Sequence, residues 1–482
     1  MSMTRLSRFL AVALLALAAA CATNPVTGER EISLMSEGQE ISIGQENHPQ
    51  ILREMGVYED PALQRYVSDI GLKLAKSSER PNLPWHFTVV DQPVVNAFAV
   101  PGGFIYITRG ILAYLDTEAQ LVGVLGHEIG HVTARHSAQQ YTRQMGGTLG
   151  LVALGIFAPG VAQSFGQLGA QALGLLFLKY GREDELQSDQ LGAKYAAANN
   201  WDPRAVPAFL STLSRLSEGS EKGIPNWLST HPEPGARVEE IQPYVQQLVG
   251  PQESFVTDRD EYLRRIDGII FGDNPEQGIV RGNTFVHPPL RFRIDYPQGW
   301  QIQNMPTQVA AKAPNADVFI LMQIVGKDPG GDIQQAALGS MQQAGFRPVD
   351  GQRTQINGME AFVGVYQGQI EGGGTVASRA AHIVHNGQVY LIAGLVPPQA
   401  FDEADPLFLQ TIRSFRTISA AEAESIRPNR VDLYTARQGD TWQSIAERSG
   451  GAVTAQTLAI MNNSQTGTQP QPGARIKIVV GG

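Results

Sequence analysis

The spacing of the hydrophobic residues changes along the chain, and each change predicts a different kind of element. In residues 31–74, apolar side chains recur every three or four positions, which is typical of amphipathic helices, and Asp60-Pro61 marks the start of one. In residues 85–108, β-branched and aromatic residues dominate, and Pro101-Gly102-Gly103 interrupts them. This second pattern predicts strands and a hairpin, and therefore a small sheet after the helices.

A further helix is predicted to begin at Thr117. Thr117 and Gln120 have the spacing of a capping box, and the apolar residues 121–125 indicate that the helix is buried. The helix then runs through His127 and His131, which lie four residues apart. Residues at this spacing are rotated by about 400°, so both imidazoles lie on one helix face, one turn apart.

The sequence His127-Glu128-Ile129-Gly130-His131 has the pattern of a metallopeptidase. Zinc held by three protein side chains keeps a position for water and lowers the pKa of that water to about 7. Glu128 can then accept the proton as a general base. The alternative is that His127 and His131 only form surface hydrogen bonds. His136 is rotated about half a turn from the face that carries His127, and we do not expect it to be a ligand.

A third ligand has to come from elsewhere in the chain. The metzincin pattern would require histidine at position 137 and glycine at 134, but the chain has Ser137 and Ala134. A carboxylate from a second helix remains. Glu185 and Asp189 share a helix face, so Glu185 can bind the metal while Asp189 hydrogen-bonds a ligand imidazole. Glu183 is the rival ligand, and carboxylates at this spacing are often only solvated charges.

The composition excludes one class of partner. The 482 residues are enough for about three domains. The formal net charge is −9, and the chain contains no block of lysine or arginine. We therefore do not expect nucleic acid as a partner.

The first twenty residues have the layout of a secretory signal. Arg5 and Arg8 precede an apolar run that is too short to span a bilayer, and Ala18-Ala19-Ala20 resembles a cleavage site. Cys21 follows directly and is the only cysteine, so it cannot form an internal disulfide. This stretch resembles a bacterial lipoprotein signal with lipid on Cys21, and Ala22 is typical of outer-membrane lipoproteins. The alternative is a soluble exported protein with an unmodified cysteine.

Residues 146–180 are rich in glycine, alanine and leucine. Glycine and glutamine interrupt every apolar run in this stretch. We therefore favour helices packed in the core over contact with a membrane.

The motifs in the first half of the chain resemble one enzyme family. Residues 127–136, together with Glu185 and Asp189, resemble the zinc metalloendopeptidases that include the HtpX-type and CAAX-prenyl-protease-type enzymes. Residues 21–28 and 96–103 resemble its exported bacterial branch, and the resemblance covers residues 22–250. It implies a gluzincin fold and one zinc ion per chain.

The resemblance also implies roles for individual residues. It makes His127, His131 and Glu185 the zinc ligands, Glu128 the general base, and Asp189 a partner of a ligand imidazole. His231-Pro232 with Arg237 matches a further motif. It predicts His231 near the cleft, where it could stabilise the oxyanion or approach the metal. The predicted edge strand that contains Asn96, Ala97 and Phe98 would hold an extended peptide by backbone pairing.

The next part of the chain predicts a separate α+β sandwich. Residues 290–296 alternate between apolar and polar, and apolar strands are predicted near 318–324, 361–366, 380–384 and 389–395. Helices are predicted near 333–344 and 401–414. The turn Tyr296-Pro297-Gln298-Gly299-Trp300 and the strand order resemble the PsbP/Mog-one-like fold. We find no catalytic constellation there, so we expect substrate or partner binding, with His382 and His385 on the strand surface.

The last segment resembles a LysM module. The resemblance rests on residues 434–446, then on Leu458, Asn462, Pro472-Gly473 and Ile476. Such modules are small βααβ units that bind N-acetylglucosamine in peptidoglycan. The alternative is a terminal cap without a ligand.

These patterns predict a multidomain α+β protein. We divide it into a signal peptide (1–20), a lipid-anchored tether (21–30), a mainly helical gluzincin metallopeptidase domain (31–252), a linker (253–283), an α+β PsbP-like sandwich (284–420) and a LysM-like βααβ module (430–480).

The predicted function is that of a zinc endopeptidase which cuts unfolded or misassembled envelope proteins in periplasmic quality control. The protein would be held at the inner face of the outer membrane as a lipoprotein, with peptidoglycan as a partner of the LysM-like module. The alternative is a periplasmic chaperone or outer-membrane assembly factor with a latent protease site. Cleavage of cell-wall peptides is less favoured, because the site resembles protein-cutting enzymes.

Overall fold

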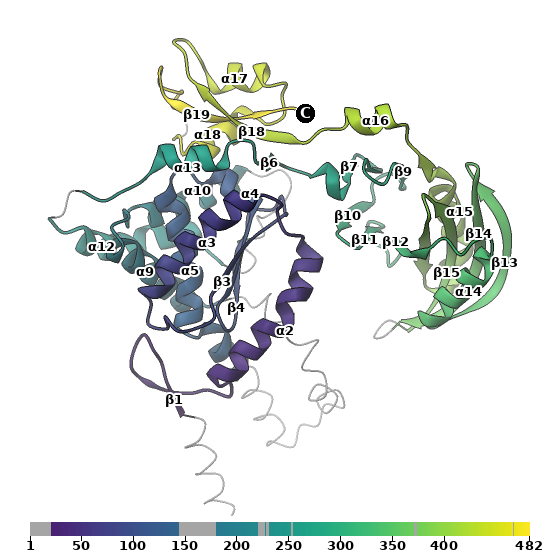
Figure 1. Ribbon diagram of the computed structural model, residues 1–482, viewed down its shortest axis with the longest axis horizontal. Coiled ribbons are helices and arrows are strands. Elements are labelled where there is room, and N and C mark those ends of the chain that lie inside the picture. Colours follow the sequence, from purple (N-terminus) through teal and green to yellow (C-terminus); the bar gives the residue numbers. More distant parts are fainter. Residues whose placement is uncertain are drawn as a thin grey trace, which may run out of the picture. The chain divides into compact units, whose positions relative to one another are not determined.

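The computed structural model describes residues 21–143, 180–219, 227, 231–251, 254–370, 374–465 and 467–482. The predicted signal peptide and almost all of the stretch 146–180 lie outside these residues. The chain forms two compact units (Figure 1). Of the described residues, those within 21–52, 56–272 and 429–481 form the first unit, and most of the second unit lies within 273–428.

The first unit begins with a hairpin and two helices. Strand β1 (Cys21–Thr23) pairs antiparallel with β2 (Arg30–Ile32), and α2 (Glu37–Met55) and α3 (Pro61–Lys76) follow. The side chain of Asp60 accepts hydrogen bonds from the first free N–H groups of α3, which explains why the helix begins at Pro61. Asn24 is buried, and its amide donates to the carbonyl of Ala134 at 3.3 Å. This hydrogen bond fixes the predicted tether segment against the body of the unit.

The first unit contains a three-stranded sheet in the order β3-β5-β4. Strand β3 (His86–Val90) runs parallel to β5 (Phe104–Thr108), and β4 (Ala97–Val100) runs antiparallel to β5. The turn between β4 and β5 needs glycine, because Gly102 has a φ of 89° and a Cβ there would lie 2.6 Å from the carbonyl oxygen of Glu40. Strand β4 is one of the two edge strands of this sheet.

The sheet packs against α3, α4 (Arg109–Tyr114) and α5 (Glu118–Thr133). Helices α9 (Arg182–Ala198), α10 (Ala205–Gly219) and α13 (Arg259–Ile266) pack on α5, and α12 (Pro234–Val249) packs on α9 and α10. Every residue of α5 is buried. Thr117 caps α5 by accepting from the N–H of Gln120, but the Gln120 side chain accepts from the N–H of Asp116 instead of completing the predicted capping box.

The C-terminal part of the first unit is a βααβ module. Strand β18 (Asn429–Thr435) pairs antiparallel with β19 (Arg475–Val480), and α17 (Trp442–Arg448) and α18 (Ala455–Met461) lie between them in the chain. Strand β18 also pairs with the short strand β6 (Ile270–Phe271). The apolar side chains of the module, among them Trp442 and Leu458, belong to the same core cluster as those of α3 and α5. The module therefore packs directly on the helices.

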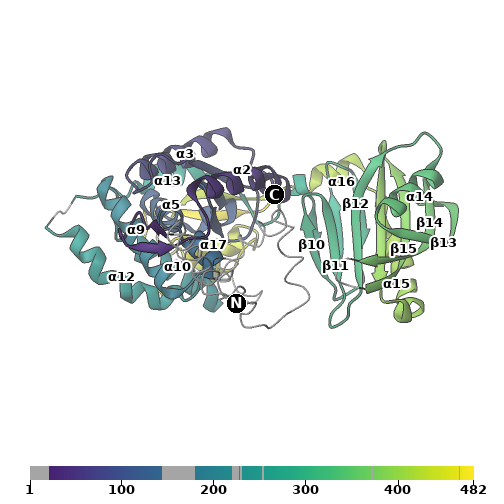
Figure 2. The same cartoon turned by 90° about the horizontal axis from the view of Figure 1, so that it is seen from below.

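The second unit contains two antiparallel sheets. The seven-stranded sheet has the order β10-β11-β12-β16-β15-β14-β13, and the four-stranded sheet has the order β17-β9-β8-β7. Strands β10 to β12 and β13 to β15 of the larger sheet can be followed in Figure 2. The strands of the larger sheet are β10 (Gln301–Met305), β11 (Gln308–Lys312), β12 (Phe319–Lys327), β13 (Phe346–Ile356), β14 (Met359–Ile370), β15 (Gly374–His385) and β16 (Gln388–Val396). The strands of the smaller one are β7 (Ile279–Arg281), β8 (Thr284–His287), β9 (Phe292–Asp295) and β17 (Arg416–Thr417).

The helices of the second unit cover both faces of its larger sheet. Helix α14 (Ile333–Gln343) packs on one face, and α15 (Phe401–Ser414) packs on the other, where it shares a core with the smaller sheet. The remaining helical pieces are η1 (Pro275–Gln277), η2 (Pro398–Ala400) and α16 (Ala420–Ser425).

The expectation that His382 and His385 lie on the strand surface is wrong. Their exposed fractions are 0% and 4%. Burial lowers the pKa of His382 to about 4, so its ring is neutral at physiological pH. Both faces of β15 are covered, by α14 and by α15, so alternate residues of this strand do not reach solvent.

Among the residues that the structure describes, no helix combines the length and the apolar character needed to span a bilayer.

Candidate metal centre

The two helices that carry the predicted ligands pack unusually closely. A Cβ on Gly126 of α5 would lie 2.9 Å from the Cα of Gly192 in α9, and a Cβ on Gly192 would lie 3.0 Å from the backbone nitrogen of His127. A Cβ on Gly130 would likewise lie 3.0 Å from the Cα of Ser188. These glycines let the two backbones approach, so that the His127–His131 face of α5 meets the Glu185–Asp189 face of α9.

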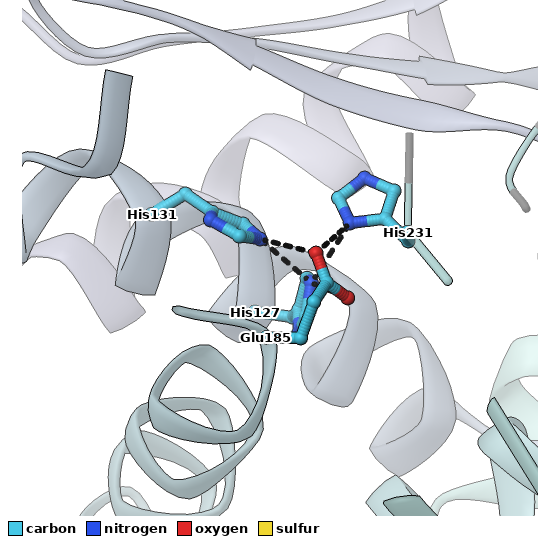
Figure 3. Close-up of side chains that lie close together, drawn as sticks. All are labelled: His127, His131, Glu185 and His231. Carbon is cyan, nitrogen blue, oxygen red and sulfur yellow. Dashed lines mark hydrogen bonds and ion pairs between the residues drawn. The ribbon is translucent and has the colours of Figure 1, made fainter. Parts of the chain in front are cut away.

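Four buried side chains converge at this contact (Figure 3). They are His127, His131, Glu185 and His231, and one possible ligand atom from each lies within 4.8 Å of the others. Nε2 of His127 is 2.9 Å from Nε2 of His131, and Nδ1 of His231 is 2.8 Å from Oε1 of Glu185. Glu183, the rival carboxylate, is exposed. The structure thus brings Glu185 into the group and leaves Glu183 outside it.

Asp189 and Arg237 support the group from behind. Nδ1 of His127 donates to Oδ1 of Asp189 at 2.8 Å, which leaves Nε2 of His127 directed into the group. Arg237 donates to both oxygens of Asp189, at 2.7 and 2.8 Å, and also to Oε2 of Glu185. Burial alone would raise the pKa of Glu185, but His231 and Arg237 hold it well below its ordinary value. Glu185 is therefore an ionised carboxylate inside a buried site.

His136 contacts the group through His131, which the sequence pattern did not predict. Nδ1 of His136 is 3.0 Å from Nδ1 of His131, and Nε2 of His136 donates to Oε1 of Gln187 at 2.8 Å. Burial lowers the pKa of His136, so its ring is neutral and has one N–H. Since that N–H faces Gln187, Nδ1 of His136 accepts the N–H of His131, and Nε2 of His131 carries a free lone pair.

Glu128 lies beside the group with both carboxylate oxygens unsatisfied. It is 1% exposed, and neither oxygen has a hydrogen-bond partner among the described residues. Nε2 of His231 lies 3.6 Å from Oε1 of Glu128. Burial raises the pKa of Glu128, although the neighbouring histidines oppose this shift. A buried carboxylate of this kind is suited to accept a proton.

Two aromatic rings enclose the group. Tyr180 stacks on His131 with the ring centroids 3.9 Å apart, and Trp227 stacks on His231 at 4.0 Å. Trp227 also meets Phe209 of α10 edge to face at 5.6 Å. These contacts restrict the ring orientations of two of the four candidate ligands.

The predicted substrate-binding residues lie at the edge strand next to the group. Ala97 and Phe98 are buried in β4, and Phe98 stacks on Tyr106 of β5 at 4.9 Å. Asn96 directly precedes β4, and no described residue hydrogen-bonds its Oδ1. The N–H of Trp227 donates to the carbonyl of Val95 at 3.2 Å, which ties the start of this edge to the ring that stacks on His231. Cys21 lies elsewhere, in β1.

The donor set fits a zinc ion. Three imidazole nitrogens and one carboxylate oxygen are ligand types that zinc prefers, and four ligands match its usual tetrahedral coordination. The hydrogen bonds that His127 donates to Asp189 and that His131 donates to His136 direct the Nε2 atoms of both ligand histidines to one point. The unsatisfied oxygens of Glu128 border the same point.

Two histidines one helix turn apart, a carboxylate from a second helix and a buried glutamate beside them define a metallopeptidase centre. Comparison with known proteins supports this class, because residues 61–245 match the description "Peptidase family M48". Residues 434–479 match "LysM domain". Residues 61–245 are therefore similar to peptidase family M48, and residues 434–479 are similar to a LysM domain.

Curated relatives match over part of the chain. The "Beta-barrel assembly-enhancing protease" of Escherichia coli (strain K12) is 30% identical over 235 residues, which are 47% of this chain and 48% of the relative. The "Mitochondrial metalloendopeptidase OMA1" of Arabidopsis thaliana is 31% identical over 181 residues, which are 37% of this chain and 36% of the relative. The chain thus spans half or less of the length of these two relatives.

Among solved structures, a cyanobacterial PsbP matches 29% of this chain and 95% of its own, with 12% identity and a TM-score of 0.24. A TM-score of this size does not establish a shared fold, so the PsbP-like fold of the second unit stays a prediction.

Proposed function

We propose that the protein is a zinc-dependent endopeptidase that hydrolyses unfolded or misassembled envelope proteins. The observation that carries this proposal is the buried group of His127, His131 and Glu185 with the unsatisfied carboxylate of Glu128 beside it. The match of residues 61–245 to peptidase family M48 supports it.

The chemistry follows from the positions of these side chains. A single zinc ion bound by His127, His131 and Glu185 would polarise the scissile carbonyl and acidify an attacking water. Glu128 would take the proton from that water and pass it to the leaving amine. Asp189 and Arg237 would keep His127 and Glu185 in place, because both are buried and hydrogen-bonded to them. The β4 edge, with Asn96, Ala97 and Phe98, would hold the peptide in an extended form.

The cellular setting is part of the same proposal. Lipid on Cys21 would anchor the protein to the inner face of the outer membrane, on the periplasmic side. The LysM domain would bind peptidoglycan. The bacterial relatives named for β-barrel assembly suggest β-barrel proteins as the substrates or clients of this one.

A second candidate is an assembly factor whose protease site is latent. His231 favours it, because its Nδ1 lies 2.8 Å from Glu185 and 3.3 Å from Nε2 of His127. A fourth protein ligand closes a zinc site, whereas a catalytic site keeps one position for water. In this state His231 would have to move away before a substrate is cut.

The first test measures zinc content and cleavage of an unfolded protein such as casein. We expect about one zinc per chain and cleavage by the wild type. Glu128→Gln keeps the metal and loses about 10²-fold or more in activity, because only the proton acceptor is removed. Glu185→Gln loses the metal. Glu183→Gln, the matched control on the exposed face of the same helix turn, changes neither.

The outcomes separate the two candidates. Zinc without cleavage by the wild type would favour the latent site, and rescue of an envelope defect by Glu128→Gln would favour an assembly role. His231→Ala tests the remaining residue. If zinc content and proteolysis are both unchanged in that variant, His231 has no role at the metal.

A further inference from the structure

A cavity of about 650 Å³ lies where the LysM domain meets the peptidase helices. Helix α18 packs beside α10 within the first unit, and both can be followed in Figure 1. The cavity lies between the start of α17 and the turn that follows α18. Its lining combines LysM residues with one residue of the peptidase domain, Arg215 of α10.

The lining has the chemistry of a carbohydrate site. Its polar side chains are mostly amides and hydroxyls, including Thr441, Gln443, Gln456, Gln465 and Gln469. Such groups donate and accept hydrogen bonds without carrying charge, as sugar hydroxyls and acetamido groups require. Within the part of the chain that the structure describes, Arg215 is the only charged residue that lines the cavity.

Among the described residues, Arg215 has no acidic partner. Its Nη2 donates to Oδ1 of Asn463 at 2.8 Å and its Nη1 donates to the carbonyl of Ser464, so its protein partners are neutral acceptors. Burial lowers the pKa of Arg215, and no acidic group opposes this shift. A half-buried guanidinium beside a cavity, with no carboxylate paired to it among the described residues, would gain from an anionic group on a ligand.

We propose that this cavity binds a glycan strand that carries carboxylate groups, and that Arg215 of the peptidase domain selects the carboxylate. The site is then shared by the two parts of the first unit, and the LysM domain alone lacks its charged wall. A bound strand would contact α10 directly. Helix α10 also carries Phe209, which meets Trp227 next to the metal group. The proposal rests on glycan binding by the LysM domain and does not depend on proteolysis.

The test compares two soluble glycans of equal length on the full chain. One is a strand of alternating N-acetylglucosamine and N-acetylmuramic acid, whose lactyl groups carry carboxylates, and the other is a neutral N-acetylglucosamine oligomer. We expect the wild type to bind the acidic strand about tenfold more tightly or better, the effect of one charge-assisted contact. Arg215→Gln should lose this preference and keep the affinity for the neutral oligomer. Added salt should weaken the preference in the wild type.

Two variants separate charge from structure. Arg204→Gln removes an exposed arginine near the start of the same helix, outside the cavity, and should leave both affinities unchanged. Asn463→Ala removes one partner of Arg215 but keeps the charge, and should retain the preference for the acidic strand. Thermal unfolding of each variant checks that the domain stays folded.

Three results would overturn the proposal. Equal loss of both glycans in Arg215→Gln would mean that Arg215 only holds the turn after α18. Equal binding of both glycans by the wild type would mean that no carboxylate is selected. Binding of neither glycan would remove the site altogether. Repeating the measurements on Glu128→Gln keeps them independent of the peptidase proposal.

Discussion

Arg237 shows how a single buried residue can hold the metal-binding group together. Arg237 is 0% exposed and donates hydrogen bonds to both Asp189 and Glu185. Asp189 in turn accepts a hydrogen bond from His127. Two carboxylates and one guanidinium therefore share one buried site, and each charge is stabilised by the opposite charges beside it.

Arg237→Met is expected to destabilise the first unit by about 3–5 kcal/mol, because two buried carboxylates lose their cation. Urea unfolding in the presence of a chelator measures this loss apart from the metal, and zinc affinity should fall as well. Arg237→Lys keeps a charge but not the forked geometry, so it should recover only part of the stability. Arg182→Met, which removes an exposed pair with Glu240, is the control and should stay within about 0.5 kcal/mol. A change no larger than the control's would contradict this role for Arg237.

Lys477, which lies outside the metal-binding group, is expected to make folding stability depend on pH. It is fully buried, donates to the carbonyl of Leu115, and has Asp116 and Arg259 as its charged neighbours. Burial lowers the pKa of Lys477 to about 8 from the ordinary value of 10.5, against the attraction of Asp116. Between pH 8 and pH 10.5, Lys477 is protonated more often in the unfolded chain than in the folded one. The contribution of this lysine to folding stability therefore rises with pH over this range.

The comparison of wild type with Lys477→Met tests this prediction. Between pH 8 and pH 10.5, the unfolding free energy of the wild type should rise relative to that of the variant, because the variant lacks the titrating group. Below pH 8 the difference should be constant. Urea unfolding at a series of pH values measures it. If the unfolding free energies of the wild type and the variant run parallel across the whole pH range, the pKa of Lys477 is not lowered in the folded protein.

At the scale of elements, the contact between α5 and α9 determines whether the site exists. A Cβ on Gly192 would lie 3.0 Å from the backbone nitrogen of His127 and 3.2 Å from the carbonyl oxygen of Gly123. Backbone atoms can make room only if the two helices separate. Separation would move Glu185 away from His127 and His131.

Gly192→Ala should therefore cost about 1–3 kcal/mol of stability and weaken zinc binding. Urea unfolding and competition with a chromophoric chelator measure the two effects. Gly339→Ala in α14 is the matched control, because nothing lies within 4 Å of the added methyl. In that helix the same change should stabilise by about 0.5–1 kcal/mol. Unchanged zinc affinity in Gly192→Ala would show that the close approach is not required.

The sequence predicts the elements well where the signals are local. Helix α15 spans the predicted residues 401–414, and α3 begins at Pro61 as its Asp-Pro signal indicates. Glu185 and Asp189 share a face because α9 is continuous through both. Contacts between distant segments leave no such signal: Arg237 meets Asp189 from 48 residues away, and no spacing rule predicts that pairing.

The position of His136 could be predicted only in part by counting helix turns along the sequence. Counting turns from His127 places it opposite the metal-binding face, and it is indeed not among the four converging side chains. However, α5 ends at Thr133, and Arg135 has a φ of 61°, which reverses the chain. The helical count no longer applies after that point, so His136 returns to contact His131. A left-handed arginine carries no sequence signal that would reveal the reversal.

At the scale of the whole molecule, the second unit is an insertion into the first. Strands β6 and β18 are antiparallel neighbours, and Phe271 is paired with Asn429, although more than 150 residues separate them in the chain. Paired residues of this kind lie about 5 Å apart, so a two-residue turn can connect them. The segment from 273 to 428 forms its own compact unit with its own cores.

Replacing residues 272–428 with Asn-Gly should therefore leave a folded protein that binds zinc and cuts unfolded casein like the parent. Removing residues 429–482 should instead give a poorly folded protein that aggregates. The LysM side chains share a core with the peptidase helices, and their loss would expose apolar surface. Zinc content, solubility and thermal unfolding of both proteins provide the measurement. If the first deletion aggregates and the second stays folded, the LysM domain is a dispensable appendage and the inserted unit supports the peptidase. The expected result would instead make the LysM domain part of the enzyme body, so that anything bound to it is held in fixed relation to the metal centre.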